Sequence, residues 1–556
     1  MKFSRRDLLI GSAGATAGLL LTPVPWKLLS DVSIWTQNWP WIPQPARGPV
    51  ETKQSFCTLC ASGCGVRARM VAGYPVGISG VRNHPVTKGA LCPLGFAAHQ
   101  LNWHPQRLRE VRHRGRGASW AEAQAAFEKA RGEGPITVVD GRPGRAASTV
   151  LESFARKQNG SCQVVLSAES QALAPYAGWS GVPVSALGYD LENARTIVSF
   201  GAPLLDGWGT PGRFTRLWSE RTAGAADPEL RLIQIEPSLS RTAARAWNWV
   251  SIREGSEAKL AAGVARVLLE EHLVTSHGPM PQLPLAEVAT QTGLTAEAIR
   301  DLARKMVENR PVVVIAADGN PAIAALNVLL GAVAAPGGIV RREEHVKSRV
   351  PSEPFIGSPR AMLLDSTVPW EFVPQTDAEV FRFAAWDGGR SKADWLLPAP
   401  GFLEELTDVP AGPTSGVDTY ALALNLVASP AEVKSTAQFL LQIDPTLPVV
   451  EKVIHARCEE IFRAQKGIVC GEQPVAVTNL ESAKNIEEQL RKGAVWMDSP
   501  PRIGEFRCEL NEWPEANKVS RASTWDTAWV PPVLPPLATK LFQESNLREA
   551  PAGRKA

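Results

Sequence analysis

The sequence predicts an α/β protein with mostly parallel sheets, preceded by a cysteine-rich module. Short runs of β-branched and other apolar residues end in glycine, Glu-Pro or Asp-Gly, and helical patterns separate them. Such runs are typical of strands buried on both faces by covering helices. The chain has 556 residues, which is too long for one hydrophobic core and indicates several domains.

The elements follow one another in a regular order. Ser119 is placed to cap a short helix, and a second helix is expected over 146–157. Ligands bind such sheets at the carboxyl ends of the strands, so Gly201, Glu236 and Gly319 mark the expected ligand-facing edge. The expected strands are 136–139, 163–166, 196–200, 232–235 and 312–315.

Four of the eight cysteines lie close together near the N-terminus. Cys57, Cys60, Cys64 and Cys92 have the spacing C-x2-C-x3-C-x27-C. Thiolates are soft ligands that select iron–sulfur clusters, zinc or copper(I). Three on one short loop and a fourth from a later turn can each bind one iron of a 4Fe–4S cluster. Neighbouring glycines such as Gly63 allow the backbone to bend tightly around it.

Two other interpretations of these cysteines remain open. A structural zinc site also uses four cysteines, but it usually pairs them as two C-x2-C groups rather than as a triplet and a single residue. Disulfides are the second alternative in an exported protein. The triplet favours the 4Fe–4S cluster, with Cys57, Cys60, Cys64 and Cys92 as its ligands.

The N-terminus indicates export. Ser4-Arg5-Arg6-Asp7 precedes an apolar run from Leu8 to Leu21, which is a twin-arginine signal pattern. That route carries folded proteins, so it suits a protein whose cofactor is inserted in the cytoplasm. We therefore expect residues 1–30 to be a signal or a retained anchor, and the protein to lie on the periplasmic side of the bacterial inner membrane.

Composition excludes one class of partner. The 59 Lys and Arg nearly balance the 56 Asp and Glu, and no lysine-rich patch with interleaved aromatic residues indicates nucleic-acid binding. Tryptophan is abundant, with 18 residues against four tyrosines, and several cluster at 35–41. Such a segment packs on the chain itself, on a partner or at a membrane interface.

The motifs between about Cys57 and Asp444 resemble a known family. They include the cysteine module, Trp120, Tyr189-Asp-Leu-Glu-Asn-Ala194, Ile197-Val-Ser-Phe-Gly-Ala202, Ile235-Glu-Pro-Ser-Leu-Ser-Arg-Thr-Ala243, Pro336-Gly-Gly338 and Ala393-Asp-Trp-Leu-Leu-Pro398 with Glu404. In this order they resemble the large subunits of the molybdopterin oxidoreductases of the dimethyl-sulfoxide-reductase type, the complex iron–sulfur molybdoenzymes.

The resemblance implies a 4Fe–4S module at 50–112 followed by two interleaved α/β domains. The first is discontinuous, at 113–165 and 340–445, and the second occupies 166–339. In the family these domains hold two molybdopterin guanine dinucleotides with molybdenum or tungsten. The residues that would contact such a cofactor here are Gly201, Glu236, Arg241, Arg253, Gly337 and Gly338.

The sequence departs from the family pattern in three places. Leu94 stands where the family usually has a lysine or arginine, two residues after the fourth cysteine. The region of the family's metal ligand has no cysteine and offers only Ser167 or Ser170. Residues 446–556 are expected to be a Pro- and Trp-rich extension, without a run of alternating strands, in place of the family's β-barrel-like capping domain.

These departures indicate one subset of the family. Leu21-Thr-Pro-Val-Pro-Trp-Lys27, Ser33-Ile-Trp-Thr-Gln-Asn-Trp-Pro-Trp41 and the leucine of Cys92-Pro-Leu-Gly95 resemble the large subunits of the menaquinone reductase complex and of alternative complex III. That resemblance implies an electron-transfer and scaffold subunit with one 4Fe–4S cluster and without its own pterin metal. The implied partners are a multihaem cytochrome c, a ferredoxin-like iron–sulfur subunit, and an integral membrane quinone-binding subunit. The alternative is a catalytic molybdenum or tungsten oxidoreductase acting on a small substrate or an oxyanion.

Overall fold

The computed structural model describes residues 4–21, 48–222, 228–275, 278–343, 359–370, 372, 376–387, 393–412, 414–498 and 503–514, with the side chains of 19–21 left out. The tryptophan cluster at 35–41 and the proline-rich tail at 529–536 lie outside these residues. The chain divides into two compact units, one of Met1–Glu51 with Arg69–Val76 and one of Thr52–Ala68 with Gly77–Ala556.

The N-terminal apolar run forms a helix. Helix α1 covers Arg5–Leu21, and Asp7 in its first turn exchanges hydrogen bonds with Ser4. Within the part of the chain that the structure describes, no helix combines the length and the apolar character needed to cross a membrane. The export signal therefore stays a prediction.

The cysteine module is built on a small sheet. Its strands are β1 (Val50–Phe56), β2 (Gly65–Val71) and β3 (Tyr74–Gly80), in the order β1-β2-β3. Helix α4 (Pro93–Ala97) and the 3-10 helix η1 (Ala98–Trp103) follow. Cys57 comes directly after β1 and Cys64 directly before β2, so one end of the hairpin carries two of the predicted ligands.

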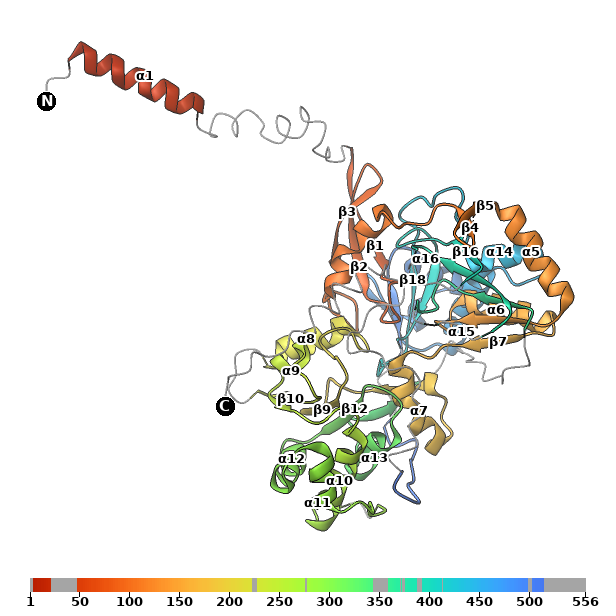
Figure 1. The fold of residues 1–556 in the computed structure, drawn as a ribbon. Coiled ribbons are helices and arrows are strands. Elements are labelled where there is room, and N and C mark those ends of the chain that lie inside the picture. Colours follow the sequence, from red (N-terminus) through yellow and green to blue (C-terminus); the bar gives the residue numbers. More distant parts are fainter. Residues whose placement is uncertain are drawn as a thin grey trace. The chain divides into compact units, whose positions relative to one another are not determined.

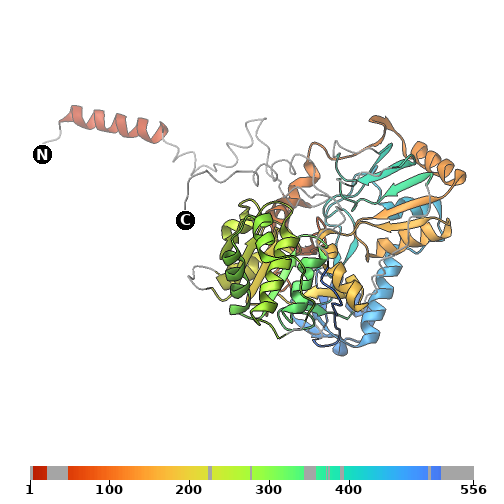
Figure 2. The same ribbon diagram turned by 60° about the horizontal axis from the view of Figure 1, so that its bottom comes forward.

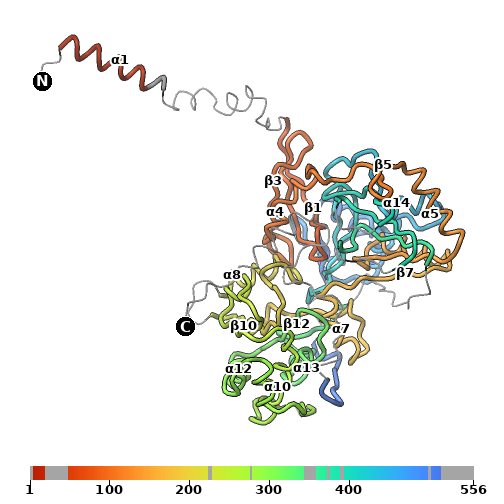
Figure 3. Tube along the Cα trace, viewed as in Figure 1, coloured from red at the N-terminus to blue at the C-terminus, as the bar shows by residue number. Residues whose placement is uncertain are grey.

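A seven-stranded sheet joins two distant parts of the sequence. Its order is β5-β4-β16-β15-β14-β6-β7, and β7, β6, β14, β15 and β16 run parallel. Figure 3 shows the orange segment that contains β7 beside the green-blue segment from later in the chain. The strands are β4 (Val111–His113), β5 (Arg116–Ala118), β6 (Ile136–Asp140), β7 (Ser161–Val164), β14 (Ala361–Leu364), β15 (Glu379–Ala384) and β16 (Trp395–Pro398).

Alternate residues of these strands face two different cores. Val138, Leu363 and Phe381 pack with α5 (Trp120–Glu133), α6 (Ala146–Lys157) and α14 (Thr436–Ile443). Val139 and Leu364 face the other side, against Val368 and Val380. This period of two is the pattern that a sheet buried on both faces requires.

The second parallel sheet has the order β11-β10-β9-β12. Figure 1 shows four helices gathered beside β9 and β12, namely α10 (Glu257–Glu270), α11 (Leu285–Thr292), α12 (Ala296–Glu308) and α13 (Pro321–Leu329), and Figure 2 shows the same helices (green) from another side. Val198 and Val314 face α10 and α12, whereas Ile197 and Val313 face α7 (Ala168–Ser180) and α8 (Pro211–Thr222). The strands are β9 (Thr196–Phe200), β10 (Arg231–Ile235), β11 (Asn248–Val250) and β12 (Val312–Ala316).

Helices connect and cover this second sheet. They are α7 (Ala168–Ser180), α8 (Pro211–Thr222), α9 (Arg241–Arg245), α10 (Glu257–Glu270), α11 (Leu285–Thr292), α12 (Ala296–Glu308) and α13 (Pro321–Leu329). The 3-10 turn η2 (Val184–Ala186) leads into β8 (Leu187–Tyr189), which pairs antiparallel with β13 (Ile339–Arg341). The expected mixed α/β fold with mostly parallel sheets is confirmed.

The C-terminal part contains strands that the sequence analysis missed. β19 (Ile468–Cys470), β20 (Pro474–Ala476) and β21 (Val495–Met497) join β17 (Thr407–Pro410) and β18 (Thr419–Ala423) in an antiparallel sheet of order β17-β18-β21-β19-β20. Helices α15 (Val450–Ala464) and α16 (Ala483–Arg491) and the turn η3 (Val477–Asn479) complete it. The expectation of no strand run after Asp444 was wrong because each strand has only three residues.

Candidate iron–sulfur site

The first three cysteines lie on a tight connection between β1 and β2. The backbone N–H of Cys57 donates to the carbonyl of Cys64 at 2.8 Å, which closes the loop. Gly63 has a φ of +59°, and a Cβ at this position would lie 2.4 Å from Cγ1 of Val409. The loop therefore requires glycine at 63 for both its backbone conformation and its packing.

The fourth cysteine begins a short helix. Cys92 is the N-cap of α4, and its sulfur accepts a hydrogen bond from the Gly95 N–H at 3.4 Å. On the first loop, the sulfur of Cys60 lies 3.2 Å from the hydroxyl of Ser62. The Gly95 N–H is a donor of the kind that stabilises a thiolate bound to a cluster, whereas the Ser62 hydroxyl accepts from Cys60 and donates to the Gly209 carbonyl at 2.9 Å.

The four thiols lie in a common electrostatic environment. Burial raises the pKa of each, and the nearby Cys60 raises it further for Cys57, Cys64 and Cys92, the last to about 11. All eight cysteines of the chain are free thiols. A cluster that binds these thiolates removes their protons, so its binding releases protons and becomes stronger as the pH rises.

The donor set has the chemistry that a 4Fe–4S cluster requires. All four candidate ligands are free cysteines, and Cys57 and Cys60 line one cavity. A zinc ion draws four sulfurs to about 2.3 Å from one point, whereas a cubane cluster takes one thiolate on each of four irons. The four cysteines are thus the residues that would hold a 4Fe–4S cluster, which supplies one-electron transfer when bound.

His84 has a structural role next to the cysteine loop. Burial lowers its pKa to about 4, so its ring is neutral at physiological pH. Its Nδ1 accepts hydrogen bonds from the N–H groups of Val86 and Thr87, at 3.3 and 3.1 Å. A Cβ on Gly65 would lie 2.9 Å from the ring, so His84 packs tightly under the start of β2.

A cavity of about 180 Å³ lies beside the cysteine loop. Cys57 and Cys60 contribute to its wall, as do Ser167 and Ser170, the two serines considered as metal ligands. Ser167 is the N-cap of α7, where its hydroxyl accepts the Ser170 N–H at 3.3 Å. The two serine hydroxyls lie 3.3 Å apart. Four arginines also line the cavity, namely Arg142, Arg145, Arg342 and Arg382.

Gly201 and Glu236 lie at the carboxyl ends of β9 and β10, as expected from the strand pattern. Gly201 has a φ of +71°, and its N–H donates to the Ile235 carbonyl at 2.9 Å. The Glu236 carboxylate accepts from the Gln234 side chain at 2.8 Å and from the Ser240 N–H at 3.2 Å. The carboxylate of Glu236 is therefore engaged in organising the turn after β10.

The two predicted arginines have protein partners. Arg241 begins α9, is 48% exposed, and lies 3.5 Å from a carboxylate oxygen of Asp206. Arg253 donates from Nη1 to the Thr290 carbonyl at 2.7 Å and packs against Gly293. Both guanidiniums lie on the second α/β domain, and their assignment to a cofactor stays a prediction.

Gly337 and Gly338 are required by the fold itself. The N–H of Gly337 donates to the Asp190 carboxylate at 2.9 Å, and its φ is +72°. A Cβ on Gly337 would lie 2.8 Å from Cβ of Pro311, and one on Gly338 would lie 1.9 Å from the Ala332 carbonyl oxygen. Both glycines thus have a packing reason that does not involve a cofactor.

The predicted residues form two groups. The structure brings the cysteines to one loop cluster, but the residues lining the 180 Å³ cavity include none of Gly201, Glu236, Arg241, Arg253, Gly337 and Gly338 among those described. The sequence analysis missed Arg142, Arg145 and Glu405. A signal for the two arginines was present in Gly141-Arg-Pro-Gly-Arg145, a polar glycine turn directly after the strand at 136–140.

Glu405 lies between two cavities. It lines the 180 Å³ cavity and also a second one, of about 250 Å³, together with Ser435. Burial raises its pKa to about 7, although the Ser435 side chain and the charge of Arg145 act in the opposite direction. Glu405 is therefore a carboxyl group that titrates near neutral pH beside the cysteine loop.

Comparison with known proteins gives a consistent assignment. Residues 50–102 match the family described as the molybdopterin oxidoreductase Fe4S4 domain. This match indicates an iron–sulfur domain of the molybdopterin-oxidoreductase type at residues 50–102, and the chain as a whole is similar to molybdopterin oxidoreductases of the dimethyl-sulfoxide-reductase type.

Several named relatives support this assignment. The chain is 28% identical over 503 residues to the menaquinone reductase, molybdopterin-binding-like subunit of Nitratidesulfovibrio vulgaris, covering 80% of this chain and 72% of that protein. It is 29% identical over 251 residues to a sulfite dehydrogenase subunit of Allochromatium vinosum, covering 41% and 24%. Acetylene hydratase from Pelobacter acetylenicus has a similar fold, with a TM-score of 0.57, 14% identity, and coverage of 81% of this chain and 74% of that one.

Proposed function

We propose that this chain is an electron-transfer and scaffold subunit of a periplasm-facing, quinone-linked oxidoreductase complex, with one 4Fe–4S cluster as its redox centre. The observation that carries the proposal is the cluster of four free, mutually interacting thiols in a domain that matches the family's Fe4S4 domain. The likeness to the menaquinone reductase subunit over most of both chains supports the quinone-linked role.

Two further features favour a relay without a pterin metal. Leu94 has no charge and no side-chain donor with which to bridge a cluster to a pterin. The cavity beside the cysteines has a volume of about 180 Å³, below the roughly 300–1,000 Å³ of sites for drug-sized ligands. Two guanylated pterins are each larger than such a ligand.

The partners and location belong to the same proposal. A subunit of this kind would receive or pass single electrons through a multihaem cytochrome c, a ferredoxin-like iron–sulfur subunit, and an integral membrane quinone-binding subunit. Export through the twin-arginine route would place it on the periplasmic side, with α1 as signal or anchor. The variant R5K/R6K is expected to retain the protein in the cytoplasm, which protease treatment of spheroplasts tests.

Metal analysis of the purified chain tests the function. We expect about four iron and four labile sulfide per chain, with molybdenum and tungsten far below one per chain. Electron paramagnetic resonance of the dithionite-reduced protein should show one cluster. Zinc without labile sulfide would reject the proposal.

The second candidate is a catalytic molybdenum or tungsten bis-pterin guanine dinucleotide oxidoreductase. The specific observation in its favour is that Ser167 and Ser170 line the cavity together with Cys57 and Cys60. About one molybdenum or tungsten per chain, lost in S167A or S170A but retained in the surface variant S119A, would favour this candidate over the relay.

A further inference from the structure

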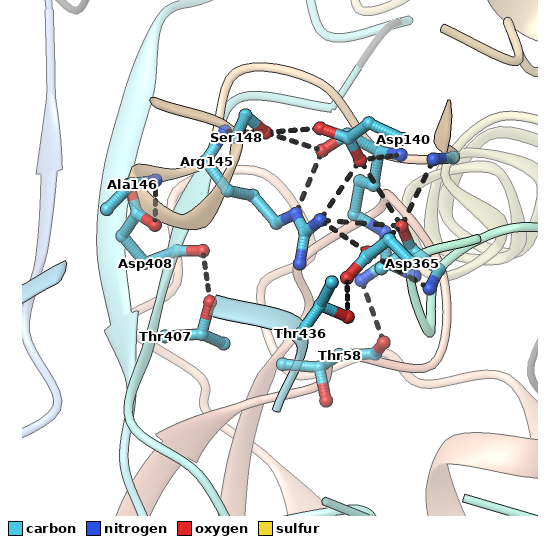
Figure 4. Close-up of polar contacts among 12 residues, drawn as sticks. Thr58, Asp140, Arg145, Ala146, Ser148, Asp365, Thr407, Asp408 and Thr436 are labelled. Atoms are coloured by element: carbon cyan, nitrogen blue, oxygen red, sulfur yellow. Dashed lines mark hydrogen bonds and ion pairs between the residues drawn. The ribbon is translucent and has the colours of Figure 1, made fainter. Parts of the chain in front are cut away.

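A loop of the first parallel sheet reaches the cysteine loop. Residues 141–145 connect β6 to α6, and Arg142 Nη1 donates to the carbonyl of Thr58 at 2.8 Å. Thr58 lies between Cys57 and Cys60 in the sequence. Figure 4 shows Thr58 close to the Asp140–Arg145–Asp365 network.

The position of Arg142 is fixed by its own loop. Its backbone N–H donates to Oδ1 of Asp140 at 2.8 Å, and its carbonyl accepts from Nε of Arg145 at 2.8 Å. Asp140 in turn lies at the end of β6. The guanidinium is therefore presented to the cysteine loop by a rigid turn and not by a freely moving surface segment.

The carboxylates nearest Arg142 are bound to Arg145, and Asp365 compensates only part of the charge of Arg142. Asp140 and Asp365 both bind Arg145, at 3.0 and 2.8 Å. In the ranges that the structure describes, Arg142 has no ion pair within 4.0 Å, and its Nη2 is buried without a hydrogen-bond partner. A buried guanidinium normally requires compensation, so a negative group is expected beside it.

The thiol groups supply that negative charge when they are deprotonated. Arg142 lines the same cavity as Cys57 and Cys60. Its hydrogen bond to the Thr58 carbonyl lies between the same two cysteines. The guanidinium is therefore close enough to the ligand loop to favour negative charge there.

We propose that the fixed positive charge of Arg142 sets the reduction potential of the cluster. This inference rests on the proposed function, since it requires a 4Fe–4S cluster on the four cysteines. One-electron reduction adds one negative charge at the site, and a fixed cation in a poorly solvated position stabilises that charge. Arg142 thereby raises the potential, while Leu94 contributes no charge from the side of Cys92.

Charge-changing variants of the full chain test the proposal. The cluster is titrated with dithionite and followed by electron paramagnetic resonance. We expect R142Q to lower the equilibrium constant for one-electron reduction about tenfold, a fall of about 59 mV in midpoint potential. R142K keeps the charge and should remain near the wild-type potential, and the exposed-residue control R114Q should not shift it.

A second variant adds a cation elsewhere. L94K places a positive charge two residues after Cys92, so it should raise the potential in the wild-type background. In the double variant R142Q/L94K it should restore part of the lost potential. A charge effect predicts this rescue, whereas a purely structural role of Arg142 does not.

The outcomes separate the two proposals. If the wild-type chain contains no iron and labile sulfide, the proposed function itself fails. A loaded R142Q with the wild-type potential overturns only the role of Arg142. If R142Q binds no cluster, the cluster contents of R142K and R142Q/L94K decide the question. A cluster in both variants supports the charge role of Arg142. An R142Q/L94K protein without a cluster overturns it.

Discussion

Arg145 and Asp365 form a buried ion pair between residues 220 positions apart in the sequence. Nη2 of Arg145 lies 2.8 Å from Oδ2 of Asp365, and the two side chains are 10% and 4% exposed. The same guanidinium binds Asp140, so it joins the ends of β6 and β14 at the base of the loop that carries Arg142. Figure 4 shows Thr436 beside Asp365, and the Thr436 hydroxyl donates a hydrogen bond of 2.7 Å to that carboxylate.

Replacing Arg145 with methionine should strongly destabilise the chain. The change leaves two buried carboxylates, Asp140 and Asp365, without their cation, and breaking a buried pair in this way costs about 3–5 kcal/mol. Urea denaturation of R145M against wild type measures the loss. The matched control is R114Q, which removes an exposed pair with Asp394 and should change the free energy of unfolding by about 1 kcal/mol or less. Equal effects of R145M and R114Q would contradict the prediction.

Glu405 should make the stability depend on pH in the neutral range. Burial raises its pKa to about 7, so the folded chain holds this proton where the unfolded chain has released it. The contribution of Glu405 to stability is therefore greatest below its unfolded pKa of about 4.5 and falls as the pH rises toward 7, by up to about 3 kcal/mol.

The variant E405Q removes this titration. The stability of E405Q relative to wild type should increase as the pH rises from 5 to 8, because other groups such as His84, whose pKa burial lowers to about 4, titrate alike in both proteins. At pH 8 the stability of E405Q should exceed that of wild type. Denaturation midpoints across this range measure both curves. E404Q is not a suitable control, because Glu404 binds Arg107 in a buried ion pair. The matched control is E110Q, which changes an exposed carboxylate and should follow the wild-type curve. Parallel curves for wild type and E405Q would reject the assignment.

Cys60→Ser should abolish the cluster signal in electron paramagnetic resonance. The hydroxyl of serine is a harder ligand than a thiolate and has a much higher pKa, so one iron loses its ligand. Iron and labile sulfide content should fall together. Cys470→Ser is the matched control, since Cys470 lies on β19 outside the cysteine loop, and it should retain the full signal. Loss of the signal in both variants would point to a general folding defect.

Local patterns were enough to predict many of the elements. The expected helix 146–157 coincides with α6, and the strands at 136–139, 196–200 and 312–315 agree with β6, β9 and β12 within one residue. In these segments, the apolar residues that the sequence pattern marks are the ones whose side chains are buried in the structure. The strand expected at 163–166 instead lies at Ser161–Val164, because its register is set by pairing with β6 and not by its most apolar residues.

Other features depend on contacts between distant parts of the sequence. β21 pairs with β18, from 419–423, so a three-residue strand such as Val495–Met497 has no local signal of its own. Arg142 reaches Thr58 across 84 positions, and no motif marks that contact. The four cysteines were predictable because metal chemistry fixes both their residue type and their spacing.

Gly337→Ala tests whether this glycine is required by packing. An alanine at this position would need a φ of +72°, and its Cβ would lie 2.8 Å from Cβ of Pro311 and 2.9 Å from the Asn193 carbonyl oxygen. Gly331 is a matched control, with a φ of +70° and nothing within 4 Å of an added Cβ. The left-handed conformation alone costs roughly 1–2 kcal/mol, which G331A should show.

The free energy of unfolding of G337A should fall by several kcal/mol more in protein that carries no cofactor, because the clash and the weakened Asp190 contact add to the same strain. Equal losses in the two variants, measured by denaturation of the cofactor-free protein, would mean that Gly337 is not required by packing and would return it to the set of expected cofactor contacts.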